Sequence, residues 1–153
     1  MKVIFLDIDG VMNSKSYDLE RKSDKGIMDP TRVELLKEII DKTGAEIVLT
    51  SSWRRGWSRY ENACFGGGKI LCQEFSRAYI EVYDKTDELG DRTKEVKAWL
   101  EDNPETEEFV ILDDIHFGWE DLDDRVVKTS YYTGRGLEEH HVNEAVKILN
   151  GER

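Results

Sequence analysis

The sequence predicts an α/β fold in which helices cover both faces of a mostly parallel central sheet. Three short segments are apolar at nearly every position, namely residues 3–6, 45–50 and 109–112. Strands of this kind are buried on both faces, as they are in parallel sheets. Longer segments with apolar residues at helical spacing lie between them. Strands that alternate with helices indicate a Rossmann-like, three-layer α/β sandwich.

The first third of the chain contains a strand and a well-delimited helix. Residues 2–10 (KVIFLDIDG) predict a buried strand that stops at carboxylates and a glycine. Residues 13–26 lack apolar periodicity and predict a loop. A helix follows, with Asp29 as its N-cap, Pro30 at its first position and Gly44 as its C-terminal stop. Its apolar face consists of Val33, Leu36, Ile39 and Ile40.

The segment 53–90 is the least regular part of the sequence. A strand is expected at residues 79–83 (YIEVY). Residues 66–69 (GGGK) lack the GxxxxGK[ST] spacing of a phosphate-binding loop and predict a flexible loop instead. The segment is short for a second domain. We therefore expect residues 1–153 to form a single domain in which residues 53–90 add a small lid or insertion.

The last third returns to the alternating pattern. A helix at about 92–102 precedes the strand at 109–112, which stops at an acidic pair. A short strand at 126–129 and a closing helix at about 137–149 complete the predicted elements. The apolar face of the closing helix consists of Val142, Ala145, Val146 and Leu149.

The composition excludes several kinds of protein. The 153 residues are 39% hydrophobic and 36% charged, which is typical of a globular domain with a highly charged surface. We see no apolar run long enough to span a bilayer and no secretory signal, so we expect a cytoplasmic location without membrane binding. Two cysteines and three histidines predict neither a disulfide framework nor a zinc site. A net charge of −11 argues against nucleic-acid binding through a wide basic surface.

Reactive side chains follow three of the predicted strands. Asp7 and Asp9 follow the first strand, Thr50 ends the second, and Asp113 and Asp114 follow the third. Ligands of open α/β sheets bind outside the carboxyl ends of the strands. We therefore expect these side chains to converge on one site.

The first two of these aspartates predict a metal site. Residues i and i+2 of a strand share a face, so Asp7 and Asp9 are expected to point the same way. Neighbouring buried carboxylates repel each other and lose hydration, and a divalent cation relieves both problems. Ligands that are all oxygen suit Mg²⁺ rather than zinc. Gly10 allows the tight backbone turn that follows.

Four motifs, taken in order, resemble those of the haloacid dehalogenase-like (HAD) superfamily of phosphohydrolases. They are residues 3–11 (VIFLDIDGV), residues 47–50 (IVLT), a cation at a helix start (Arg92 or Lys94) and residues 110–114 (VILDD). Together they span most of the chain. Residues 51–54 (SSWR) are also similar to a compact subgroup associated with RNA-repair phosphatase modules.

The resemblance implies roles for the acidic residues. Asp7 is then the nucleophile that becomes an aspartyl-phosphate. Asp9 acts first as the general acid and then as the general base. Asp113, with Asp114, holds Mg²⁺ together with Asp7 and the carbonyl of Asp9.

The resemblance also implies which residues bind the phosphoryl group. Thr50, or Ser51 after a register shift of one residue, donates a hydrogen bond to the phosphoryl oxygens. Arg92 and Lys94 are two residues apart on one predicted helix, so one of them faces the site, and we favour Arg92 at the helix start. The expected substrate-binding residues are Gly10, Ser51, Arg54 and Lys94.

These features predict a Mg²⁺-dependent phosphate-monoester hydrolase with no cap domain or a minimal one. Its substrate is a phosphorylated small molecule or a polynucleotide end, and the tryptophans and arginines of residues 53–59 favour nucleotide and nucleic-acid ends. Nothing in the sequence indicates a stable protein partner. Transfer of the phosphoryl group to an alcohol requires the same residues as hydrolysis.

Two other classes of protein stay open. One is a non-catalytic or regulatory module that binds phosphoryl groups and Mg²⁺, and the other is a metal-dependent nuclease. A phosphorylation-controlled receiver is disfavoured by the order of the motifs. In receivers the acidic pair begins the chain, whereas here Asp7 precedes Thr50 and the acidic pair comes late.

Overall fold

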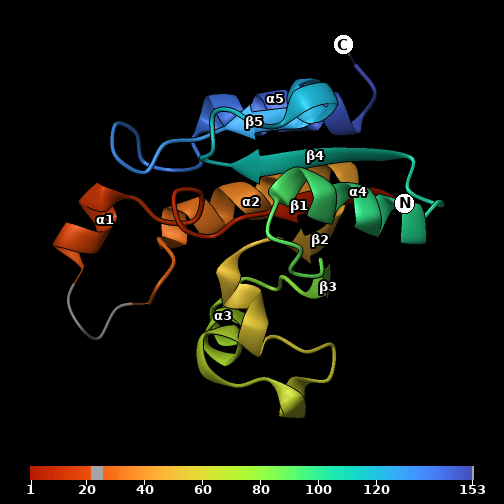
Figure 1. Ribbon diagram of the computed structural model, residues 1–153. Coiled ribbons are helices and arrows are strands. Elements are labelled where there is room, and N and C mark those ends of the chain that lie inside the picture. Colours follow the sequence, from red (N-terminus) through yellow and green to blue (C-terminus); the bar gives the residue numbers. More distant parts are fainter. Residues whose placement is uncertain (22–25, 153) are drawn as a thin grey trace.

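The computed structural model describes residues 1–21 and 26–152, and five strands in this part of the chain form one sheet. All neighbouring strands are parallel, in the order β3-β2-β1-β4-β5 (Figure 1). The strands are β1 (Lys2–Leu6), β2 (Glu46–Leu49), β3 (Val82–Lys85), β4 (Glu108–Asp113) and β5 (Val126–Lys128). This arrangement confirms the predicted α/β fold with its parallel sheet.

Strand β1 lies at the centre of the sheet, and its side chains divide between two hydrophobic cores. Ile4 and Leu6 belong to one core, and Val3 and Phe5 belong to the other. All four side chains are fully buried. Because alternate residues of a strand point to opposite faces, a strand that is apolar throughout needs helices over both faces.

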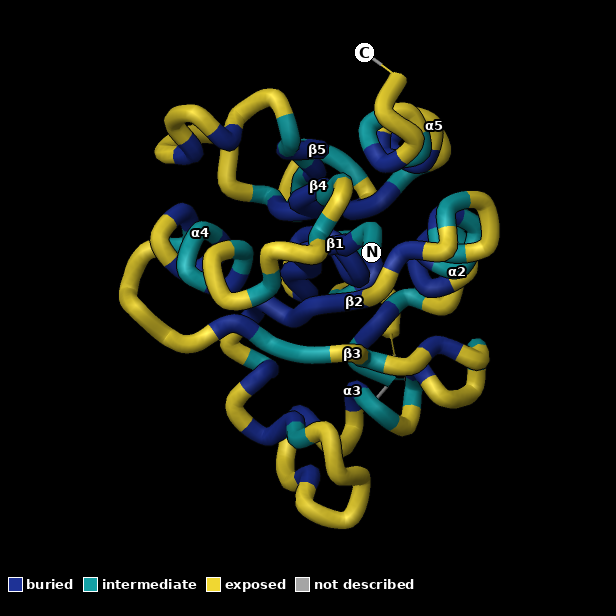
Figure 2. The backbone as a smooth tube through the Cα atoms, turned by 90° about the vertical axis from the view of Figure 1, so that its right-hand side faces the viewer, coloured by how far each residue is buried: buried dark blue, intermediate teal, exposed yellow. Residues whose placement is uncertain are grey.

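Helices cover both faces of the sheet (Figure 2). One face packs against α2 (Pro30–Thr43) and α5 (Glu139–Leu149), and the other packs against α4 (Arg92–Asp102). All three helices match the predicted ones, and both predicted caps of α2 are confirmed. Asp29 accepts a hydrogen bond from a backbone N–H of the first turn, and Gly44 ends the helix with a φ of 73°. None of the helices in the described part of the chain is long and apolar enough to cross a bilayer.

The loop predicted at residues 13–26 is wrong in part, because it contains the short helix α1 (Lys15–Glu20). The Ser14 side chain caps α1 by accepting a hydrogen bond from the Tyr17 N–H at 3.2 Å. Tyr17 is buried, and its hydroxyl donates to the Met28 carbonyl at 3.1 Å. A helix of six residues with a single buried anchor has no apolar period to detect. Residues 22–25 of the predicted loop lie outside the described residues.

The flexible loop predicted at residues 66–69 is also wrong. These residues form the first turn of α3 (Gly66–Arg77), which packs on the 3₁₀ helix η1 (Ser52–Gly56). A Cβ at Gly68 lies 2.1 Å from the backbone carbon of Gly56, and a Cβ at Gly67 lies 2.2 Å from the Trp53 ring. The glycines are therefore needed for close packing between α3 and η1.

The strand predicted at residues 79–83 begins later, as β3. The N–H groups of Ala78 and Ile80 both donate to the Phe75 carbonyl and so complete the end of α3. The segment 53–90 thus adds α3 and an edge strand to the sheet, together with the 3₁₀ helix η2 (Glu61–Ala63). A further 3₁₀ helix, η3 (Glu120–Arg125), precedes β5.

We expect Gly68→Ala to destabilise the protein by about 1–3 kcal/mol, because the added methyl group meets the Gly56 backbone. Helix propensity alone favours alanine by about 1 kcal/mol, so the two effects have opposite signs. Urea unfolding followed by circular dichroism measures the change. Gln73→Ala, at an exposed position of the same helix, is the control and should leave the free energy of unfolding nearly unchanged. Stabilisation by Gly68→Ala contradicts the packing argument.

Candidate active site

The predicted reactive residues converge at the carboxyl edge of the sheet. Leu6 of β1 is level with Leu49 of β2 and Leu112 of β4 in the parallel register. The hydrogen bonds continue one residue further, from Asp7 N–H to the Leu112 carbonyl and from Thr50 N–H to the Leu6 carbonyl, each at 3.0 Å. The register of the sheet therefore brings Asp7, Thr50 and Asp113 to the same level.

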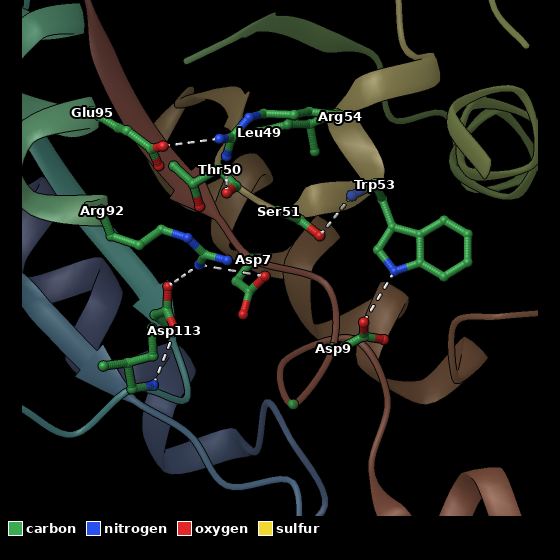
Figure 3. A network of polar contacts seen from close by, with 12 residues as sticks. Asp7, Asp9, Leu49, Thr50, Ser51, Trp53, Arg54, Arg92, Glu95 and Asp113 are labelled. Atoms are coloured by element: carbon green, nitrogen blue, oxygen red, sulfur yellow. Dashed lines mark hydrogen bonds and ion pairs between the residues drawn. The ribbon is translucent and has the colours of Figure 1, made fainter. Parts of the chain in front are cut away.

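Arg92 contacts both the aspartate that follows β1 and the aspartate that ends β4. Its Nη1 lies 2.6 Å from Asp113 Oδ2 and 3.5 Å from Asp7 Oδ1 (Figure 3). Arg92 is the first residue of α4, so the helix start points its guanidinium at the strand ends. Lys94 lies two residues further along, about 200° around the helix, and is exposed. Of the two candidate cations, the structure thus brings Arg92 to the aspartates.

Burial changes the acidity of both aspartates. Asp7 is 6% exposed, and burial together with the nearby Asp113 carboxylate raises its pKa to about 7, although Arg92 opposes the shift. Burial also raises the pKa of Asp113 to about 6, again opposed by Arg92. One guanidinium does not balance two buried carboxylates, so this site favours a further positive charge.

A third carboxylate completes an acidic cluster. Oxygen atoms of Asp7, Asp113 and Asp114 lie within 4.8 Å of one another. A set of carboxylate oxygens, short of positive charge, fits a hard divalent cation. Gly10 makes room for the third carboxylate, because a Cβ at this position lies 2.2 Å from Asp114 Oδ2. Gly10 also adopts a φ of 85°, which favours glycine.

Thr50 and Ser51 differ in what their hydroxyls contact. Thr50 is 1% exposed, and its Oγ1 has no hydrogen-bond partner among the described residues. Ser51 Oγ instead accepts a hydrogen bond from the Trp53 N–H at 3.2 Å and caps η1. A buried hydroxyl without a partner is costly and is expected to find one in a bound ligand. Of the two hydroxyls, that of Thr50 is therefore the one left without a partner among the described residues and able to donate to a ligand.

Asp9 does not point the way that strand alternation predicts. Strand β1 ends at Leu6, and residues 8–12 form a tight turn, so the i, i+2 rule for strands does not reach Asp9. Asp9 is exposed, and its carboxylate turns towards Trp53 rather than Asp7 (Figure 3). Trp53 Nε1 donates to Asp9 Oδ2 at 3.1 Å. The carboxylate of Asp9 is outside the acidic cluster of Asp7 and its two partners.

Asn13 is a second partner of Asp9 that the sequence analysis missed. Its Nδ2 donates to Asp9 Oδ1 at 2.9 Å, and its Oδ1 accepts from the Gly10 N–H at 3.0 Å. Asn13 is buried and so holds both Asp9 and the turn. An asparagine three residues after a glycine turn is a usable sequence signal, because asparagine side chains commonly bond nearby backbone groups.

Arg54 was expected to bind substrate, but the structure places it elsewhere. It is 4% exposed, and its Nη2 donates to Glu95 Oε2 at 3.0 Å. Its Nη1 donates to the Thr50 carbonyl. Its two Nη groups are therefore paired inside the protein, with Glu95 and with the Thr50 backbone (Figure 3).

A parallel sheet that carries a buried aspartate at the end of its central strand and an acidic pair at the end of the next is the arrangement of HAD-like domains. The comparison with protein families agrees with this class. The model described as the HAD domain in Swiss Army Knife RNA repair proteins matches residues 3–142, so the chain belongs to this family. Comparisons with curated proteins and with solved structures gave no match.

We expect Gly10→Ala to destabilise the protein more than Gly90→Ala does. Both glycines have nearly the same left-handed φ, 85° and 84°, so alanine costs about 1–2 kcal/mol of backbone strain at either. A Cβ at Gly90 has no atom within 4 Å, whereas at Gly10 it overlaps Asp114. Overpacking adds about 1–3 kcal/mol at Gly10. Chemical denaturation of both variants measures the difference, and equal losses contradict a close contact between Gly10 and Asp114.

Proposed function

We propose that the protein hydrolyses phosphate monoesters with Mg²⁺ through an aspartyl-phosphate on Asp7. The observation that carries the proposal is the contact of Asp7 with Arg92, whose Nη1 lies 3.5 Å from Asp7 Oδ1, at a sheet edge that also holds Thr50, whose buried hydroxyl has no partner among the described residues (Figure 3). Phosphoryl transfer requires a protein to position a nucleophile, a cation and a hydrogen-bond donor around one phosphoryl group. Asp7, Arg92 and the Thr50 hydroxyl are suited to these three roles. Membership of a HAD family supports the same chemistry.

In the first step, a carboxylate oxygen of Asp7 attacks phosphorus while the bond from phosphorus to the ester oxygen breaks. Asp9 gives its proton to the departing oxygen, which leaves as an alcohol. Arg92 and Thr50 donate to the non-bridging oxygens of the phosphoryl group and stabilise its charge in the transition state. Asp7 then carries the phosphoryl group as a mixed anhydride.

In the second step, water attacks the phosphorus of the aspartyl-phosphate. Asp9, now a carboxylate, takes a proton from that water, and the bond between phosphorus and the Asp7 oxygen breaks. Inorganic phosphate leaves, and Asp7 and Asp9 return to their starting states. Trp53 and Asn13 support this role because they hold the Asp9 carboxylate by hydrogen bonds of 3.1 and 2.9 Å, while Asp9 itself is exposed and so open to water.

Three carboxylates are suited to hold Mg²⁺, namely those of Asp7, Asp113 and Asp114. The ion supplies positive charge that neutralises the transferring phosphoryl group. The raised pKa of Asp7, caused by burial and by Asp113, supports a cation at this place, because a bound cation favours the ionised nucleophile.

The substrate class that we propose is a terminal phosphate of a nucleotide or polynucleotide. The family description names RNA repair, which supports an RNA end as the substrate. The net charge of −11 leaves recognition to local groups such as Arg92 rather than to a wide basic surface. We therefore expect turnover of a polynucleotide end to depend only weakly on salt.

The first test is phosphate release from an aryl phosphate by wild type and Asp7→Asn, with Mg²⁺ or EDTA. We expect release to need Mg²⁺ and to fall by about 10³-fold or more in Asp7→Asn, because the nucleophile is lost. Asp41→Asn, on the exposed surface of α2, is the control and should keep full activity. A substrate screen then compares small phosphate esters, mononucleotides and phosphorylated oligoribonucleotides.

Other results of the same test identify the alternative classes. Mg²⁺ binding without turnover of any phosphate ester indicates a binding or regulatory module. Cleavage of phosphodiesters but not of monoesters indicates a nuclease. Appearance of a phosphorylated alcohol in place of inorganic phosphate, when glycerol is added, indicates a phosphotransferase.

Metal binding has a readout that does not depend on activity. We expect Mg²⁺ to raise the melting temperature, since a ligand at 100 times its Kd stabilises the folded state by about 2.7 kcal/mol. Asp114→Asn should remove most of this shift, because it removes one carboxylate of the acidic cluster. Asp123→Asn, at an exposed aspartate of η3, should keep it. An equal Mg²⁺ shift in both variants contradicts the proposed ligand set.

A further inference from the structure

Arg54 and Glu95 form an ion pair inside the protein, next to the site but not in it. Arg54 lies in η1 and Glu95 in α4, and each is 4% exposed. Arg54 Nη2 and Glu95 Oε2 are 3.0 Å apart. A buried ion pair adds little net stability, because both charges lose their hydration. The role of this ion pair is therefore to be sought in the groups whose positions it fixes.

The Arg54 end of the pair fixes the backbone of Thr50. Arg54 Nη1 donates to the Thr50 carbonyl, while the Thr50 N–H donates to the Leu6 carbonyl at 3.0 Å. Thr50 is thus held on both sides of its Cα, by β1 and by η1. Its hydroxyl is left without a partner among the described residues, next to Asp7 and Arg92 (Figure 3).

The Glu95 end fixes the start of α4. Besides Arg54, Glu95 Oε2 accepts a hydrogen bond from the Leu89 N–H at 2.8 Å, so it ties the helix to the segment before it. Glu95 lies three residues after Arg92, and residues at this spacing are neighbours on a helix surface. The position of the first turn of α4, and with it the base of the Arg92 side chain, therefore depends on Glu95.

We propose that Arg54 and Glu95 are positioning residues. They hold the Thr50 hydroxyl and the Arg92 guanidinium where both can donate to the oxygens of the transferred phosphoryl group. The inference rests on the proposed function. Without the pair, the loop after β2 and the start of α4 lose their direct side-chain link, and the two donors no longer converge on one set of oxygens. Arginine suits this place because its planar fork bonds two acceptors at fixed angles, which lysine does not.

The test is a double-mutant cycle of Arg54→Lys and Thr50→Ala. Two quantities are measured well below each melting temperature: kcat/KM for an aryl phosphate, and the affinity for inorganic phosphate with Mg²⁺ by calorimetry. We expect Arg54→Lys to lower kcat/KM by about 10–100-fold, because small misplacements of site residues cost this much. We expect the phosphate affinity to fall as well.

The coupling between the two changes distinguishes positioning from simple stabilisation. If Arg54 acts through Thr50, the loss in the double variant is at least about tenfold smaller than the product of the two single losses. Arg55→Lys is the matched control, since Arg55 is the next residue and bonds Glu88 at 2.8 Å in an exposed pair. It should leave kcat/KM unchanged within about twofold.

Several outcomes overturn the inference. Losses that multiply show that Arg54 acts independently of Thr50. A lower melting temperature with unchanged kcat/KM and phosphate affinity shows a stabilising role only. If Arg54→Lys does not fold, Glu95→Gln replaces it in the cycle, because glutamine keeps an acceptor for the Leu89 N–H.

The two readouts also separate this inference from the proposed function. If wild type binds phosphate but hydrolyses no ester, the proposed function is wrong. The inference is then still tested by the double-mutant cycle, measured as the affinity of each variant for inorganic phosphate. If wild type neither binds phosphate nor hydrolyses esters, both are overturned.

Discussion

Two carboxylates buried beside one guanidinium, at the end of the central strand, are the constraint on which the site depends. Asp7 and Asp113 lose hydration and repel each other, and Arg92 offsets only part of that cost. With Asp114, three carboxylates face one guanidinium. This excess of negative charge makes the edge of the sheet suitable for binding a cation. The apolar strands β1 and β4 keep Asp7 and Asp113 there, because their burial on both faces fixes their ends.

The region around Asp7 and Asp9 depends on backbones that approach closely. Gly56 and Gly68 let η1 and α3 touch, and Gly67 leaves space for the Trp53 ring. Trp53 then reaches Asp9, which lies 44 residues earlier in the chain. The segment 53–77 therefore belongs to the site through packing, although its own sequence shows no catalytic motif. The same segment contains Arg54, whose guanidinium forms an ion pair with Glu95 inside the protein.

Much of the fold could be predicted from the sequence because its signals are local. Apolar runs identify the strands β1, β2 and β4, and capping residues identify both ends of α2. The motifs follow the strand ends, so the convergence of Asp7, Thr50 and Asp113 follows from parallel pairing alone. The errors lie where local signals are weak. α1 has one buried anchor, and the glycines of α3 resemble a loop until their neighbours are known.

The sequence by itself determined the fold class and the convergence of Asp7 with Asp113 and Asp114, because both depend on residue type and order along a strand. Only the tertiary structure showed that Arg92 rather than Lys94 contacts the aspartates, and that the hydroxyl of Ser51 caps η1 while that of Thr50 has no partner among the described residues, because these pairs differ in direction rather than in chemistry. It also turned Arg54 inward and Asp9 towards Trp53. Side-chain direction beyond the end of a strand is set by contacts from distant segments, and no periodicity in the chain encodes them.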